Sequence, residues 1–114
     1  PTFMMEAARV ALSCDNYVEE FNAEYLKRRD IIKQGLSEIP GLRIGDLEGA
    51  FYAFVDITGT GMTDIEFANG ALKAGVQLIP ASLITGGEGF VRISYAADEE
   101  VIFEGLKRLK KWLI

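Results

Sequence analysis

One arginine stands in the middle of a short stretch that alternates like a β-strand. The stretch 89–96 reads GFVRISYA, with Val91, Ile93 and Tyr95 on one face and Arg92 on the other. A guanidinium among apolar neighbours is costly unless an anion pairs with it. Because an arginine on a rigid strand can bind a carboxylate through two parallel hydrogen bonds, Arg92 is a candidate carboxylate clamp. The spacing alone favours another interpretation, an edge-strand arginine that reaches solvent or pairs with one of the chain's own 17 acidic residues.

Several other chemistries are excluded by residue types that the chain lacks. There is no histidine, so the Ser-His-Asp and Cys-His mechanisms of nucleophilic catalysis are unavailable. With one cysteine and no histidine, a conventional zinc site is not expected, and we predict no metal. Gly59 and Gly61 lack the spacing and the ending of phosphate-binding loops, so we expect them only to turn the chain.

The composition is that of one acidic globular domain. The chain has 114 residues, of which 49% are hydrophobic and 25% charged, which suffices for one core but not for two domains. The net charge of −5 argues against a nucleic-acid partner, and no apolar run is long enough to cross a bilayer, so no membrane partner is expected. Cys14 has no cysteine to pair with, which together with the lack of a signal peptide predicts a cytoplasmic protein.

The elements that must position Arg92 alternate between helices and strands. The pattern predicts a short N-terminal helix, a long amphipathic helix over about 15–39, a strand over 50–57, a helix between a capping box at Thr63 and Gly75, a short strand over 76–79, the Arg92 strand and a last helix from Asp98. The strand over 50–57 is apolar on both faces, so we expect it to be central and covered on both sides.

These elements predict an α/β (α+β) two-layer sandwich, a small mixed sheet packed with helices. All of 1–114 forms one domain in this interpretation, with residues 1–38 as a helical lead-in and residues 39–114 as a sheet-and-helix body. The chain starts Pro1-Thr2-Phe3 without an initiator methionine and enters a helical pattern at once, so we expect it to be a fragment of a longer protein.

Several runs of the chain, taken together, resemble the C-terminal segment of class I/II (fold type I) pyridoxal-phosphate-dependent aminotransferases. They follow one another in the family's order, and they are Tyr17–Leu36, Ile39–Leu42, Glu48–Phe54, Ala74–Val76 with Pro80, and Gly87–Ala96. The last two are similar to the family's "aGV.v.PG..F" and "g.g.vRis.a" patterns. The resemblance covers nearly the whole chain, and the aspartate aminotransferase-like branch is the nearest.

The resemblance implies the small domain of a homodimeric enzyme that moves an amino group between an amino acid, with aspartate as the best candidate, and a 2-oxo acid. Arg92 matches the family's arginine that binds the substrate's α-carboxylate. Phe51 matches an aromatic position near the cofactor mouth in some members, although a core aromatic would need no such role. Pyridoxal 5'-phosphate and its Schiff-base lysine would belong to a large domain upstream, so this chain alone would be inactive and contain no catalytic residue.

The loop after Pro80 departs from the family pattern. The family usually has Pro-Gly-Ser-x-Phe-Gly, whereas residues 80–85 read PASLIT, which puts the loop's shape and the substrate preference in question. Lyase and synthase branches of the family use the same arginine. Two interpretations outside the enzyme class also stay open. One is a stand-alone amino-acid-binding or regulatory α/β domain in which Arg92 binds a carboxylate without catalysis, and the other is an interaction domain that uses the long helix over 15–39.

Overall fold

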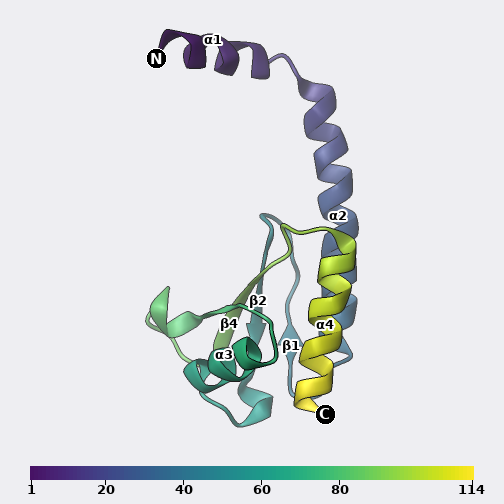
Figure 1. The fold of residues 1–114 in the computed structure, drawn as a ribbon, viewed down its shortest axis with the longest axis vertical. Helices are drawn as coiled ribbons and strands as arrows, with labels where there is room; N and C mark the ends of the chain where they lie inside the picture. The colour runs from purple at the N-terminus through teal and green to yellow at the C-terminus, as the bar shows by residue number, and fades with distance from the viewer.

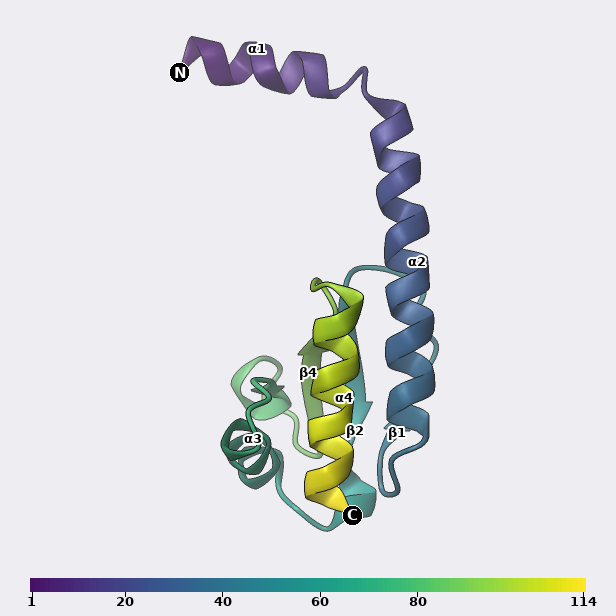
Figure 2. The same cartoon turned by 45° about the vertical axis from the view of Figure 1, so that its right-hand side comes forward.

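The computed structural model describes residues 1–114 and consists of a sheet-and-helix body with a helical arm extending from it (Figure 1). The arm is formed by α1 (Thr2–Ala11) and the first half of α2 (Asp15–Ser37), whose second half runs beside α4 along the body (Figure 2). The other elements are β1 (Arg43–Ile44), β2 (Tyr52–Asp56), α3 (Asp64–Lys73), β3 (Ile79–Pro80), β4 (Phe90–Ser94) and α4 (Glu99–Leu113). Short 3-10 helices, Thr58–Thr60 and Ala81–Leu83, lie in the connections.

The four strands form one sheet in the order β1-β2-β4-β3. Every neighbouring pair is antiparallel, so the expected mixed sheet is wrong in this respect. β2 and β3 do run in the same direction, and α3 is the helical crossover that connecting two such strands requires. However, β4 lies between them and runs opposite to both, so no two adjacent strands are parallel.

One face of the sheet carries the core, and the predicted two-layer sandwich is confirmed. Three helices, α2, α3 and α4, supply the second layer. The buried residues of the strands are Ala53, Val55, Val91 and Ile93, and those of the helices include Ile32, Leu36, Phe67, Ala71, Ile102, Leu106 and Leu109. Alternation along each strand sends every second side chain into this layer.

The opposite face of the sheet is open, which corrects one expectation. β2 is central, as predicted, but Tyr52 and Phe54 are 37% and 41% exposed. The strand is therefore not covered on both sides within residues 1–114. Because the core residues of α2, α3 and α4 belong to the same cluster as those of the strands, the helices all pack against the face that bears Ala53 and Val55.

Local signals set the two ends of α3 as expected. Thr63 accepts a hydrogen bond from the backbone N–H of Glu66, and the Glu66 carboxylate accepts one from Thr63 N–H, which completes the predicted capping box. Gly75 follows the end of α3 at φ +84°, in the left-handed region that favours glycine.

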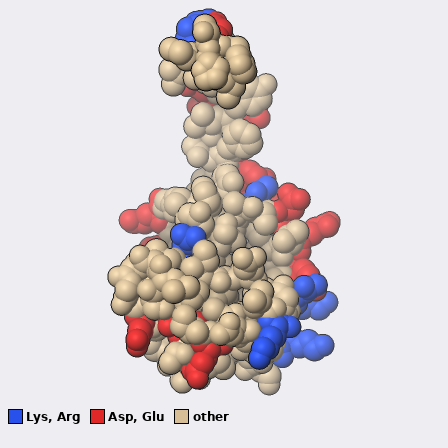
Figure 3. All heavy atoms as spheres, turned by 60° about the vertical axis from the view of Figure 1, so that its left-hand side comes forward, with Lys and Arg blue, Asp and Glu red and all other residues tan.

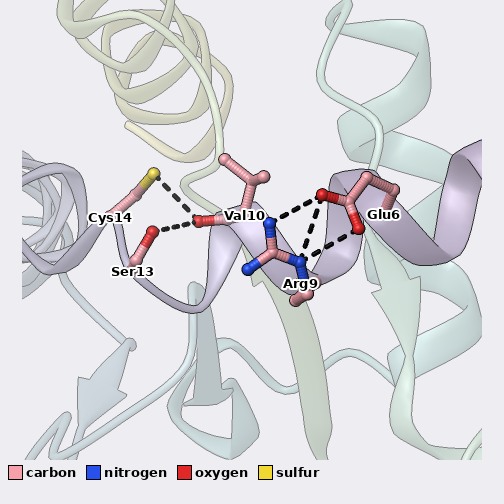
Figure 4. A network of polar contacts seen from close by, with 5 residues as sticks. All are labelled: Glu6, Arg9, Val10, Ser13 and Cys14. Atoms are coloured by element: carbon pink, nitrogen blue, oxygen red, sulfur yellow. Dashed lines mark hydrogen bonds and ion pairs between the residues drawn. The ribbon is translucent and has the colours of Figure 1, made fainter.

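The junction between α1 and α2 is closed by short-range polar contacts. Ser13 Oγ and Cys14 Sγ both donate to the carbonyl of Val10, at 2.7 and 3.4 Å, and Arg9 pairs with Glu6 within α1 (Figure 4). No residue of α1 is buried, although Phe3 and Met5 are among its large apolar side chains. On the face that Figure 3 shows, residues other than Lys, Arg, Asp and Glu cover most of the end of the arm. None of the helices combines the length and the apolar character needed to cross a membrane.

Candidate substrate-binding site

Arg92 lies at the centre of the open face, on an interior strand. β4 is paired on both sides, with Arg92 opposite Phe54 of β2 and Ile79 of β3, so the edge-strand interpretation is wrong. The guanidinium makes no ion pair with any acidic residue of the chain; its carbon Cζ lies over the ring of Tyr52, 4.3 Å from the centroid. An uncompensated cation in the middle of a sheet is a feature that needs an explanation, and an external anion supplies one.

Phe51, the second predicted residue, lies close to the same point. Its ring centroid is 4.5 Å from that of Tyr52 and 6.1 Å from that of Tyr25 on α2. Phe51 is 39% exposed, so it is not the core aromatic that the alternative interpretation would require. The structure therefore brings Arg92 and Phe51 together through Tyr52, which contacts both.

Tyr52 is the residue that sequence reasoning missed. Alternation does place it on the second face of its strand, but only the register between β2 and β4 shows that this face is the one bearing Arg92. The same register stacks Phe54 on Phe90, with ring centroids 5.2 Å apart and ring planes 11° apart. Arg92 thus shares its face of the sheet with the rings of Tyr52, Phe54 and Phe90, a surface suited to a carboxylate attached to an apolar group.

The acidic residue on this face is already neutralised. Asp56 follows Tyr52 and Phe54 on the same side of β2, and its carboxylate pairs with Arg43 at 2.9 Å. Hydrogen bonds from the Thr58 hydroxyl and backbone N–H, and to a lesser degree Arg43, lower the pKa of Asp56. Because Asp56 has these partners, it does not compete for Arg92, which stays available for a ligand.

The largest cavity is elsewhere and is a weaker candidate for a charged ligand. It has a volume of about 480 Å³, lies between α4 and the segment before β3, and includes neither Arg92 nor Phe51. Its cation, Arg108, is paired with Glu104 at 2.9 Å and donates to the carbonyl of Gly75. The open face therefore remains the better site.

The chain's own residues do not form a complete cofactor site. All of its lysines lie on α2, α3 and α4, the helices that pack on the opposite face of the sheet from Arg92. Several are ion-paired there, such as Lys33 with Asp46 at 2.7 Å. No group of three or more acidic or cysteine side chains comes together as a metal site.

Comparisons with known proteins identify relatives along nearly all of the chain. No protein-family model matches it. It is 43% identical over 98 residues to an aspartate aminotransferase of Pyrococcus horikoshii, a match that covers 84% of this chain and 25% of that protein. It is 39% identical over 117 residues to aromatic-amino-acid aminotransferase 2 of Thermococcus litoralis, covering 98% of this chain and 30% of that protein. The chain therefore spans about a quarter of the length of the curated relatives that it matches.

Solved structures give the same result for the fold. An aromatic aminotransferase from Pyrococcus horikoshii superposes with a TM-score of 0.81 at 40% identity, covering 86% of this chain and 26% of that one. An aspartate aminotransferase from Rhizobium meliloti gives a TM-score of 0.81 at 32% identity, covering 85% and 27%.

Proposed function

Since this chain belongs, along the length that it matches, to the family of aspartate and aromatic aminotransferases, we propose that it is the C-terminal small domain of a pyridoxal-phosphate-dependent aminotransferase. The domain comprises 1–114, with residues 1–38 leading into the body. The whole protein would transfer an amino group between an amino acid, aspartate being the first to test, and a 2-oxo acid.

Arg92 carries this proposal, and its proposed role is to bind the substrate's α-carboxylate. Two observations support this role: the guanidinium has no anionic partner in the chain, and it is held over Tyr52 on a strand paired on both sides. A fork of two N–H groups fixes both the position and the orientation of a carboxylate, so the bonds at the adjacent carbon are held in one direction. Phe51 and Tyr52 would form the apolar wall beside the bound carboxylate.

The cofactor is assigned to a part of the protein outside these residues. Because no lysine lies on the face that bears Arg92, the chain by itself does not fit a covalently held pyridoxal 5'-phosphate, and we propose that the chain alone is inactive. Amino-acid and 2-oxo-acid substrates and a homodimeric whole protein, as the family resemblance implies, complete the proposed set of partners. The proposed compartment is the cytoplasm, which fits the single free Cys14.

The test is a set of arginine variants in the whole protein that contains this chain. Arg92→Ala should lower kcat/KM for the amino donor by roughly 30- to 5,000-fold, because truncating one partner of a desolvated charge pair costs about 2–5 kcal/mol. Arg92→Lys should recover only part of this, since an ammonium cannot form the planar fork. Transamination is measured with aspartate and with an aromatic amino acid as donor.

Arg108→Ala is the matched control, because Arg108 lies on α4, away from the face that bears Arg92, and pairs with Glu104. It should leave kcat/KM nearly unchanged. If the Arg92→Ala enzyme kept its kcat/KM, Arg92 would not be the residue that binds the α-carboxylate. A whole protein that binds amino acids but transfers no amino group would instead favour the non-catalytic binding domain.

A further inference from the structure

Tyr95 holds two consecutive carbonyl groups of the segment that leads into β2. Its hydroxyl donates to the carbonyl of Ala50 at 2.9 Å, and its backbone N–H donates to the carbonyl of Phe51, also at 2.9 Å. The side chain is 1% exposed and belongs to the core cluster, so the donor is fixed in place. One residue, just beyond the end of the strand that bears Arg92, thus holds the backbone carbonyl groups on both sides of Phe51.

The segment held in this way has an unfavourable backbone conformation. Ala50 has φ +58°, which makes it the chain's one non-glycine residue in the left-handed region. That conformation is costly for any residue with a Cβ, so it persists only where the surroundings enforce it.

Packing does not enforce this conformation. Gly49 has open space where a side chain would be, and Ala50 itself lines a cavity of about 300 Å³ between this segment and α2. With little packed against the turn, the two hydrogen bonds from Tyr95 are what remains to hold it. Burial raises the pKa of the Tyr95 hydroxyl, against a weaker opposing effect of Arg29, so the hydroxyl keeps its proton near neutral pH and can donate.

We propose that Tyr95 is a positioning residue, which holds the strained turn at Ala50 and the carbonyl groups on both sides of Phe51 and thereby orients the Phe51 ring beside Tyr52. The consequence of this positioning for substrate binding rests on the function proposed above. The geometry itself does not, because the two hydrogen bonds fix the carbonyl groups before and after Phe51, and the backbone between them sets the direction of its side chain.

Tyr95→Phe tests this in residues 1–114 by NMR, because it removes the hydroxyl and keeps the ring. The variant should lose at least half of the cross-peak intensity between the rings of Phe51 and Tyr52. The amide hydrogen of residue 95 should exchange about tenfold faster, as expected when a neighbouring hydrogen bond is lost and the turn opens. The stacked pair of Phe54 and Phe90, on the same face but away from the turn, should be unchanged.

A second substitution separates positioning from general loss of stability. Ala50→Gly in the Tyr95→Phe background should restore most of the Phe51 to Tyr52 intensity, because glycine adopts a positive φ without the steric cost. Ile93→Val is the matched control on the same strand and the same buried face. It removes one methyl group from the core and no hydrogen bond, so the Phe51 contacts should persist.

If Tyr95→Phe does not fold, Ala50→Val tests the same turn, because it changes the exposed residue whose carbonyl accepts the hydrogen bond from Tyr95. A β-branched residue is strained at φ +58°, so the Phe51 to Tyr52 contact should weaken while the core stays intact. Unchanged ring contacts and unchanged amide exchange in the folded Tyr95→Phe variant, or in Ala50→Val, would overturn the proposal. None of these signals depends on enzyme activity, so they are independent of whether Arg92 proves to be the clamp.

Discussion

Arg92 and Tyr52 form a pair in which the aromatic ring helps to orient the guanidinium group. The guanidinium carbon lies 4.3 Å from the ring centroid, so the ring limits the directions that the long side chain can take. A cation that is already oriented loses less conformational freedom when an anion binds. The pair therefore explains how a site with no anion of its own can still be preorganised.

Tyr52→Ala should weaken this preorganisation. Loss of a cation–π contact at a partly exposed site costs about 0.5–1 kcal/mol, so KM for the amino donor in the whole protein should rise about 2- to 5-fold with little change in kcat. Tyr52→Phe keeps a ring under the guanidinium and should behave nearly as the parent protein does. If Tyr52→Phe were as impaired as Tyr52→Ala, the hydroxyl group rather than the ring would be the important feature.

Among the elements, α3 shows how far local sequence determines structure. Thr63, Glu66 and Gly75 mark its two ends, and the structure has the capping box and the left-handed glycine at these positions. The alternation around Arg92 likewise predicts which side chains are buried: Val91, Ile93 and Tyr95 are 0%, 6% and 1% exposed. These signals are readable because they depend on residues close together in the chain.

Features that depend on pairing between distant strands could not be read in this way. The contact between Tyr52 and Arg92 requires the register of β2 against β4, which no local pattern encodes. The open face around Phe54 was missed for a related reason. An apolar strand face predicts that something will cover it, but it does not show whether the cover belongs to the same 114 residues.

Thr63→Ala should destabilise the body by about 1 kcal/mol, the usual cost of losing an N-cap side chain. The variant also loses the hydrogen bond from the Thr63 hydroxyl to the Glu66 carboxylate, whereas the bond from the Thr63 backbone N–H to that carboxylate remains possible. Urea unfolding followed by circular dichroism measures the change in the free energy of unfolding. Thr63→Ser retains the hydroxyl and should cost far less, and equal losses in the two variants would contradict a capping role.

At the scale of the whole molecule, acidic groups make stability depend on pH. Interaction with Ser82, whose backbone N–H donates to the carboxylate, lowers the pKa of Asp64, which is the one buried charged residue. The pKa values of Asp56 and Glu66 are lowered through Thr58 and Thr63 in the same way. In each case the folded-state pKa lies below that of the unfolded chain, so the contribution to stability is present above the unfolded value and is lost as pH falls.

Unfolding by urea should therefore become easier as the pH is lowered from 7 through about 4, the range of unperturbed carboxyl groups, towards 3. Asp64→Asn should flatten this dependence and lower the stability at pH 7, because an amide accepts more weakly from the Ser82 N–H, which lies 2.8 Å from the carboxylate. Asp15→Asn, at an exposed position on the arm, is the control and should leave the pH profile as it is. A profile that is flat between pH 7 and 3 in the parent chain would contradict this account.

The arm gives the molecule an elongated shape. The radius of gyration is 16.8 Å and the principal extents are 51 × 27 × 25 Å, whereas a compact domain of this length would have a radius of gyration of about 13 Å. The difference comes from α1 and the first half of α2, which contribute no fully buried residue to the core. Stability and overall shape are therefore set by different parts of the chain.

The strand order also determines when the sheet can be completed during synthesis. β4 is the last strand to leave the ribosome, yet it occupies a place between β2 and β3. Until residues 90–94 have been made, β2 and β3 have no common neighbour to join them, and the nascent chain cannot close its sheet one strand at a time. The segment that bears Arg92 thus both completes the sheet and supplies the candidate clamp, so a chain released before this segment is made has neither a complete sheet nor the clamp.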